Sequence, residues 1–258
     1  MRLMKRILSA AAVLALSASL LVGCSSGTAS SVPVSASSAA ESTVSSVEET
    51  ASSAVDENEA AAAQLLNDLT GSYQELWPVI LADEYKQTWL DDCTALVGEE
   101  NAEAAFEKLS SMVTSDVYGE DAVKAYANGG GAYFCGFTNS LATLTFDGET
   151  STISGTDKDG NVLFSHTYHY IGMEPVRGLY EFESDDADSG EFTYFFLAPD
   201  TSAETYHIEF RYGSDAEALS QYDAGEYAYW LASGISTDCD QTMIDNCIEL
   251  FCTENLAG

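Results

Sequence analysis

The residues best suited to chemistry lie together on one short segment late in the chain. Thr205–Tyr212 is predicted to be a strand, and alternate strand residues point to opposite faces, so His207, Glu209 and Arg211 share one face. An imidazole and a carboxylate two residues apart can bind one zinc or similar divalent ion. Arg211 on the same face offers Glu209 an ion pair instead. Two interpretations of this face therefore stand, a metal site at His207 and Glu209 or a polar face with an internal salt bridge.

Two further histidines lie three residues apart in the segment His166-Thr-Tyr-His169. That spacing would align both imidazoles on a helix, but the segment is predicted to be a strand, where positions three apart face opposite sides. We therefore expect that the two do not share one ion and that both are exposed or hydrogen-bonded strand residues, which is the preferred interpretation. The alternative is that either His166 or His169 supplies a further ligand.

Acidic residues gather in the segment Asp185-Asp-Ala-Asp-Ser-Gly-Glu191, between two predicted strands. Alternating oxygen ligands of this kind suit Ca²⁺. The segment lacks the full EF-hand loop and its two flanking helices, so a solvated hairpin tip is the preferred interpretation. Asp157–Asp159 is a shorter example of the same pattern.

The cysteines do not form a recognisable metal or catalytic motif. Five of them follow Cys24, and an odd number leaves at least one unpaired within the molecule. No Cys-x-x-Cys motif occurs, so a thiolate zinc site is not expected. No Gly-x-Ser-x-Gly motif occurs either, and we expect no enzymatic activity. The five are Cys93, Cys135, Cys239, Cys247 and Cys252, and the last two are poorly spaced to join each other on a predicted helix.

The elements that must position these residues divide into a helical half and a strand-rich half. Helical spacing of apolar residues predicts helices over Asn58–Asp68, Glu84–Leu96 and Glu100–Val113. The glycines Gly129–Gly131 end that half, and turn signals follow at Asp147-Gly148 and Asp159-Gly160. Strands are predicted at Leu141–Phe146, Asn161–Ile171, Arg177–Ser184, Phe192–Ala198 and Thr205–Tyr212. About six consecutive strands predict an antiparallel barrel or sandwich, which helices over Ser214–Gln221 and Gln241–Phe251 would close.

The N-terminus carries an export signal. A basic stretch over residues 1–6 precedes the apolar run Ile7–Leu21, which has the length of a secretory signal and is short for a membrane span. Leu21-Val-Gly-Cys24 fits the lipobox pattern, in which the cysteine thiol is acylated and the chain is cleaved before it. We therefore expect a signal peptide over residues 1–23 and a lipid on Cys24 that anchors the protein to the extracytoplasmic face of the cell membrane. The alternative is an ordinary signal peptide that ends near a cysteine.

Composition separates a tether from a domain. Residues 24–57 are rich in Ser, Ala and Glu and cannot bury enough apolar surface to fold, whereas residues 58–258 have the length of one domain. The chain has 9 basic and 42 acidic residues, and three of the bases lie in the signal peptide, so six remain and the mature formal charge is −36. Such a charge opposes binding to nucleic acid and to anionic surfaces and attracts cations.

Three stretches of the domain follow one another in a recognisable order. The first is Gly71-Ser-Tyr-Gln-Glu-Leu-Trp-Pro78, the second runs from Tyr168 through Arg177-Gly-Leu-Tyr-Glu-Phe-Glu183 to Phe196-Leu-Ala-Pro199, and the third is His207-Ile-Glu-Phe-Arg-Tyr-Gly213 with Glu226-Tyr-Ala-Tyr229. Together they resemble the ZinT (YodA-like) zinc-binding domain family over most of Thr70–Leu256. The resemblance implies a mainly β fold, a calycin/lipocalin-like antiparallel β-barrel with N-terminal and C-terminal helices.

Members of that family bind zinc through three histidines near the barrel mouth. The resemblance places these positions at His207, Glu209 and Phe195, so that one ligand is kept, one is replaced by a different possible ligand and one is lost. The histidine-rich loop of the family is also absent. The resemblance therefore implies a weakened zinc site at His207 and Glu209.

Two functions follow from these observations. The first is a cell-surface lipoprotein that captures zinc or a related divalent ion and passes it to an ABC-type metal importer. The second is a barrel without metal, in which Phe195 and Arg211 line a cavity for a small apolar ligand or a protein partner. An ion pair between Glu209 and Arg211, with no histidine at ligand distance, would favour the second.

Overall fold

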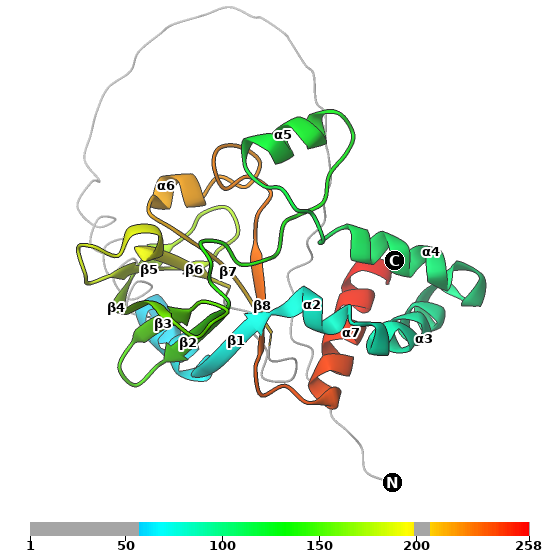
Figure 1. The fold of residues 1–258 in the computed structure, drawn as a ribbon, viewed down its shortest axis with the longest axis horizontal. Helices are drawn as coiled ribbons and strands as arrows, with labels where there is room; N and C mark the ends of the chain where they lie inside the picture. The colour runs from blue at the N-terminus through cyan, green and yellow to red at the C-terminus, as the bar shows by residue number, and fades with distance from the viewer. Residues whose placement is uncertain (1–56, 199–206, 258) are drawn as a thin grey trace, which may run out of the picture. The chain divides into compact units, whose positions relative to one another are not determined.

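Strand pairing dominates the fold. The computed structural model describes residues 57–198 and 207–257, and the signal peptide, Cys24 and the tether up to residue 56 lie outside these ranges. Within them, eight consecutive strands pair antiparallel and the first also pairs with the last, which closes a barrel (Figure 1). The strands are β1 (Gly71–Glu75), β2 (Thr143–Asp147), β3 (Thr152–Thr156), β4 (Val162–Met173), β5 (Tyr180–Ser184), β6 (Tyr194–Leu197), β7 (His207–Gly213) and β8 (Ala232–Ser236). The predicted antiparallel barrel with flanking helices is confirmed.

Three strands were not predicted: β3, and the two that close the barrel, β1 and β8. β1 precedes the helical half, and within its five residues only Tyr73 is fully buried, so its alternation is too short to stand out. β8 contains the small residues Ala232, Ser233 and Gly234, and it is buried on both faces, so it shows no alternation at all. Because β1 and β8 pair with each other, the periodicity of the sequence did not predict that the barrel closes.

Most helices lie between β1 and β2. The chain forms a helix over residues 57–68 before β1, as predicted, and the helix α5 between the predicted helices and Gly129–Gly131 was not foreseen. Across the described ranges, no helix combines the length and apolarity that a membrane span requires. The remaining helical elements are α2 (Leu76–Ile80), η1 (Asp83–Tyr85), α3 (Lys86–Val97), α4 (Glu99–Ser111), α5 (Glu120–Ala127), η2 (Gly190–Phe192), α6 (Ala216–Leu219) and α7 (Gln241–Leu256).

Two separate groups of buried side chains hold the molecule together. The first, here called the barrel core, fills the barrel, and its large aromatic members are Tyr73, Phe137, Phe146, Phe164, Tyr168, Phe182, Phe195, Phe196, Phe210, Tyr212, Tyr227 and Trp230. The second, here called the helical core, joins α2, α3, α4 and α7 to the outer face of β8 through Ile235. Figure 1 shows α3, α4 and α7 together on one side of the barrel.

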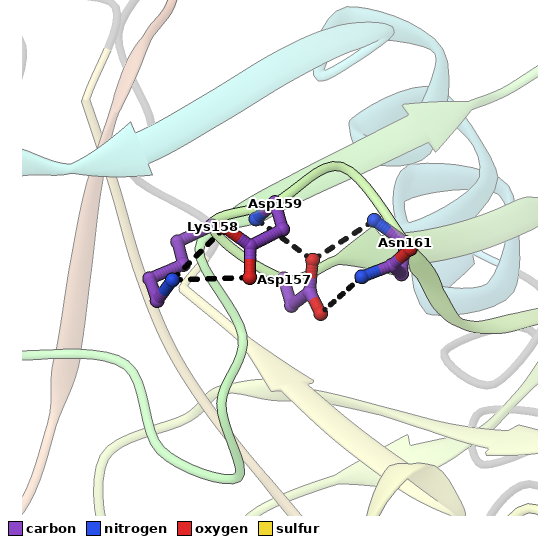
Figure 2. A network of polar contacts seen from close by, with 4 residues as sticks. All are labelled: Asp157, Lys158, Asp159 and Asn161. Carbon is purple, nitrogen blue, oxygen red and sulfur yellow. Dashed lines mark hydrogen bonds and ion pairs between the residues drawn. The ribbon is translucent and has the colours of Figure 1, made fainter.

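One carboxylate fixes the turn between β3 and β4 (Figure 2). Asp157 Oδ1 accepts hydrogen bonds from the backbone N–H groups of Asp159 and Asn161 at 2.9 and 2.8 Å, and Oδ2 accepts one from Asn161 Nδ2 at 2.9 Å. The side-chain and backbone donors of Asn161 hold the pKa of Asp157 below its ordinary value. Because both oxygens are used within the turn, this structure opposes the Ca²⁺ alternative for Asp157–Asp159.

Candidate functional site

The two faces of β7 separate the residues that the sequence singled out. Ile208, Phe210 and Tyr212 belong to the barrel core, so the alternate residues His207, Glu209 and Arg211 lie on the outer face. Partners across an antiparallel pair share a face, and Phe195 lies opposite Tyr212. Phe195 therefore points into the barrel. The wall of the barrel separates it from the other two positions that the family resemblance had grouped with it.

Phe195 is fully buried and surrounded by aromatic rings. Its ring centroid lies 5.3 Å from that of Tyr212, 5.4 Å from Tyr168, 5.8 Å from Phe164 and 6.4 Å from Phe210. This packing makes Phe195 part of a filled interior. Phe195 and Arg211, which were predicted to line one cavity, are instead on opposite faces of the sheet.

Arg211 is also fully buried, but against the segment that follows α6. Its guanidinium donates hydrogen bonds to the backbone carbonyls of Leu219, Gln221 and Tyr227, and it lies over the ring of Tyr222 at 4.3 Å. Burial lowers the pKa of Arg211. The salt bridge expected with Glu209 is not among the ion pairs of residues 57–198 and 207–257. The structure does not support that alternative, because α6 and the chain after it supply carbonyl acceptors for Arg211 that a strand pattern does not reveal.

His207 and Glu209 remain on the outer face, where they are half-buried. They lie opposite Ile235 and Ser233 of β8, beside the helical core. In the part of the chain that the structure describes, no three potential ligands of the His, Cys, Asp and Glu types come together. The metal site at His207 and Glu209 therefore stays a prediction.

The other two histidines are each fixed by an aspartate. His166 Nδ1 lies 2.7 Å from Asp186 Oδ2, and His169 Nδ1 lies 2.7 Å from Asp185 Oδ1. His166 lies opposite Ile153 of the barrel core and is on the inner face, with 17% of its side chain exposed, whereas His169 is on the outer face and 52% exposed. The prediction that these histidines face opposite sides is confirmed.

This arrangement leaves one nitrogen of each ring able to bind a metal. When Nδ1–H donates to the carboxylate, Nε2 carries the lone pair, and a carboxylate that holds the far side of an imidazole is the usual second shell of a metal-binding histidine. His166 and His169 have no partner for Nε2 among the described residues. The fit to zinc is partial, since each site offers one imidazole nitrogen and water or another donor must complete the coordination.

The sequence indicated the two histidines and the acidic turn as candidate residues, but it did not predict the contacts between them. The register of β4 and β5 places Tyr168 opposite Ser184, so the residues that flank this pair lie side by side. A predicted hairpin with Tyr168 opposite Ser184 would have predicted these contacts. Two carboxylates of the turn are thus partners of histidine, a role that neither the Ca²⁺ nor the solvated interpretation assigned to them.

A hollow of about 290 Å³ lies outside the barrel, between α2 and the segments 113–116 and 134–136. Trp77 and Cys135 line it, and the indole N–H of Trp77 is buried. The thiol beside it is a weak acceptor, and burial, with a smaller effect of the Glu209 charge, raises the pKa of Cys135 to about 12. Cys135 is therefore a thiol at neutral pH. Carboxylates of Glu75 and Asp116 also line the hollow.

No protein-family model matches the chain, and no curated protein matches its sequence. Among solved structures it is similar to the Zn(II)-bound ZinT-like domain of Streptococcus pneumoniae AdcA, with 15% identity and a TM-score of 0.45, over 71% of this chain and 89% of that one. It is also similar to Zn(II)-bound AdcA from Streptococcus pneumoniae, with 14% identity and a TM-score of 0.43, over 72% of this chain and 35% of that one. The first carries the type of domain that the sequence motifs resemble. Likeness at this level carries no conclusion about ligands.

Proposed function

We propose that this protein is a lipid-anchored extracytoplasmic protein that binds a divalent metal ion, zinc in the first place, and releases it to an importer in the same membrane. The observation that carries the proposal is the pair of contacts between His166 and Asp186 and between His169 and Asp185. Each contact orients an imidazole so that Nε2 can accept a metal ion.

The proposed sites suit reversible capture better than tight storage. One imidazole nitrogen with water ligands holds zinc less firmly than the closed four-ligand sites that stabilise zinc proteins. The formal charge of −36 on the mature chain raises the concentration of cations near the surface. A weak site in such a field fills quickly and empties quickly, which is what transfer to a transporter requires.

Calorimetric titration of the mature chain with zinc tests the proposal. Residues 24–258 with Cys24→Ser give a soluble protein that has all three histidines. We expect saturable binding with a Kd of about 10–100 μM at neutral pH, which weakens in His166→Ala and in His169→Ala. His207→Ala is the matched control. Saturable binding that is lost only in His207→Ala would refute these sites and place the metal at His207 and Glu209. No saturation up to about 1 mM would refute metal binding as the function.

The anchor has its own test. In cells that express the full chain, we expect incorporation of labelled palmitate and recovery in the membrane fraction. Cys24→Ser removes the acylated thiol, so both should be lost. A Cys24→Ser protein that stays membrane-bound after a high-salt wash would contradict the lipid anchor.

A binding module without metal is the second candidate, and the hollow beside α2 favours it. The lining of this hollow is largely apolar and includes Glu75 and Asp116, which suits a small molecule with an apolar body and a polar group. Native mass spectrometry of protein purified from membranes would detect such a molecule. We expect it to be lost from Thr114→Trp, which fills the hollow from an exposed position, and retained in His166→Ala.

A further inference from the structure

Two cysteines meet where α3 packs against α7. The Sγ atoms of Cys93 and Cys252 lie 3.9 Å apart, and both residues are fully buried in the helical core. They are 159 positions apart in the sequence, so their contact depends on the folded arrangement of the two helices. The first cysteine belongs to the middle of α3 and the second to the last part of α7.

Aromatic packing fixes the position of this contact. The ring of Phe251, beside Cys252, lies 6.0 Å from the ring of Trp89 on α3 and 4.7 Å from that of Trp77 on α2. Trp89 Nε1 donates a hydrogen bond to the carbonyl of Ile80 at 2.7 Å, so this ring is itself held in place. The two sulfur atoms are therefore held in contact by neighbours on both helices.

Charge at the same interface pushes the helices apart. Asp92 Oδ2 is buried and has no hydrogen-bond partner among the described residues. Burial, and then the charges of Glu249 and Asp245 on α7, raise the pKa of Asp92. A covalent bond beside Asp92 would offset this repulsion.

We propose that Cys93 and Cys252 form a disulfide bond that joins α3 to α7 in the mature protein. The bond forms by thiol–disulfide exchange with a donor disulfide, either of an oxidoreductase or of oxidised glutathione. The thiolate of one cysteine attacks the donor and releases one donor thiolate, and the second cysteine then attacks the mixed disulfide and releases the other. Two protein thiols are oxidised, the donor disulfide is reduced to two thiols, and the two protons pass to the released thiolates.

Burial determines when the exchange takes place. Burial raises the pKa of both thiols, so few thiolates are present in the folded reduced protein at neutral pH. We therefore expect the bond to form during folding and to resist reductants afterwards. Within the cell it rests on the proposed export, which supplies an oxidising compartment. The experiment below uses purified protein and defined glutathione, so its outcome is independent of the anchor and of metal binding.

Peptide mapping tests the pairing directly. The mature chain with Cys24→Ser is refolded in a glutathione redox buffer with a metal chelator, and free thiols are then alkylated in denaturant. Cleavage after glutamate places Cys93 in residues 85–99 and Cys252 in residues 250–254, whereas Cys239 and Cys247 share residues 227–249 and Cys135 lies in residues 121–149. We expect the peptides 85–99 and 250–254 to be recovered as one linked species. Recovery of both as separate alkylated peptides would overturn the proposal.

Thermal unfolding of the oxidised and the reduced protein gives an independent measurement. Closing a loop of this length is expected to raise the Tm of the oxidised protein by about 10 °C over the reduced protein. The double variant Cys93→Ser with Cys252→Ser should show no redox-dependent shift, and Cys239→Ser, at a half-buried position, should keep the shift. Equal Tm values for oxidised and reduced wild-type protein would overturn the proposal.

Discussion

The barrel core and the helical core are built on different physical principles. The barrel core lies inside a closed ring of backbone hydrogen bonds and is filled by stacked aromatic rings, and the hydroxyl of Tyr212 is satisfied by Thr138 at 2.9 Å. The helical core has no such ring. It depends on side-chain packing between helices, and it contains a pair of cysteines in contact and, at Asp92, a carboxylate oxygen without a hydrogen-bond partner among the described residues.

This difference indicates where the chemistry of the molecule lies. A filled and hydrogen-bonded interior resists the insertion of a ligand or a charge, since any change there leaves a cavity or an unsatisfied group. The groups that remain available to a ligand are instead the imidazoles of His166 and His169, which meet the acidic turn, and the residues that line the hollow outside the barrel. The proposed sites therefore depend on residues outside the filled aromatic interior.

The largest expected effect comes from placing an imidazole inside the barrel. Phe195→His restores the histidine that the family resemblance assigns to this position, but it buries a polar ring among aromatic ones. We expect a loss of about 3–5 kcal/mol in the free energy of unfolding, measured in urea, and no gain in zinc affinity. Phe195→Leu is the control and should cost less. Unchanged stability together with tighter zinc binding would mean that the interior is a metal site.

Arg211 tests the outer wall of the barrel. Arg211→Met keeps much of the side-chain volume but leaves the carbonyls of Leu219, Gln221 and Tyr227 without their donor. We expect the free energy of unfolding to fall by about 2–4 kcal/mol. Arg177→Met is a matched control, because Arg177 also lies 4.3 Å from the ring of Tyr222 but is only half-buried. Equal losses in the two variants would contradict the structural role assigned to the buried guanidinium.

Asp186, which contacts His166, should affect zinc binding and not the stability of the fold. In Asp186→Asn the amide cannot stabilise the imidazole of His166 as a carboxylate does, so we expect zinc affinity to fall about tenfold. The urea midpoint should stay unchanged because Asp186 is exposed. Asp188→Asn, in the same turn, is the control and should bind zinc as the wild type does. A loss of equal size in Asp188→Asn would indicate that only general acidity matters.

The smallest expected effect is a pH-dependent gain in stability when the charge of Asp92 in the helical core is removed. The folded-state pKa of Asp92 is raised, by burial first and then by Glu249 and Asp245, so the folded protein binds the proton more tightly than the unfolded chain. Stability therefore falls as pH rises from the ordinary aspartate value through the raised pKa. Asp92→Asn should gain about 0.5 kcal/mol at pH 7, after screening by solvent, and nothing below about pH 3.5. An equal gain at both pH values would exclude the charge as its cause.

The sequence predicted the class of the fold better than its closure. Alternation and turn dipeptides predicted β2, β4 to β7 and the antiparallel barrel, and the alternation of buried and exposed residues is clearest in β4 and in the first half of β7. β8 has both faces buried, and α5 is short, so neither shows a clear period. Barrel closure depends on the pairing of β1 with β8, which are far apart in the chain.

The candidate site was predicted only as separate parts. The opposite orientation of His166 and His169 follows from strand geometry alone. Their contacts with Asp186 and Asp185 depend on the register of one hairpin, and the contacts of Arg211 depend on a segment without regular structure. The family resemblance assigned Phe195 and His207 to one metal site, but the two residues lie on opposite faces of the sheet.

The most direct test of the account observes the imidazoles themselves. The chain has three histidines, so nitrogen-15 spectra of the mature protein resolve one ring pair for each. On titration with zinc at neutral pH, we predict that the Nε2 signals of His166 and His169 shift while the signals of His207 stay in place. A shift confined to His207, or no shift at any histidine, would contradict the account.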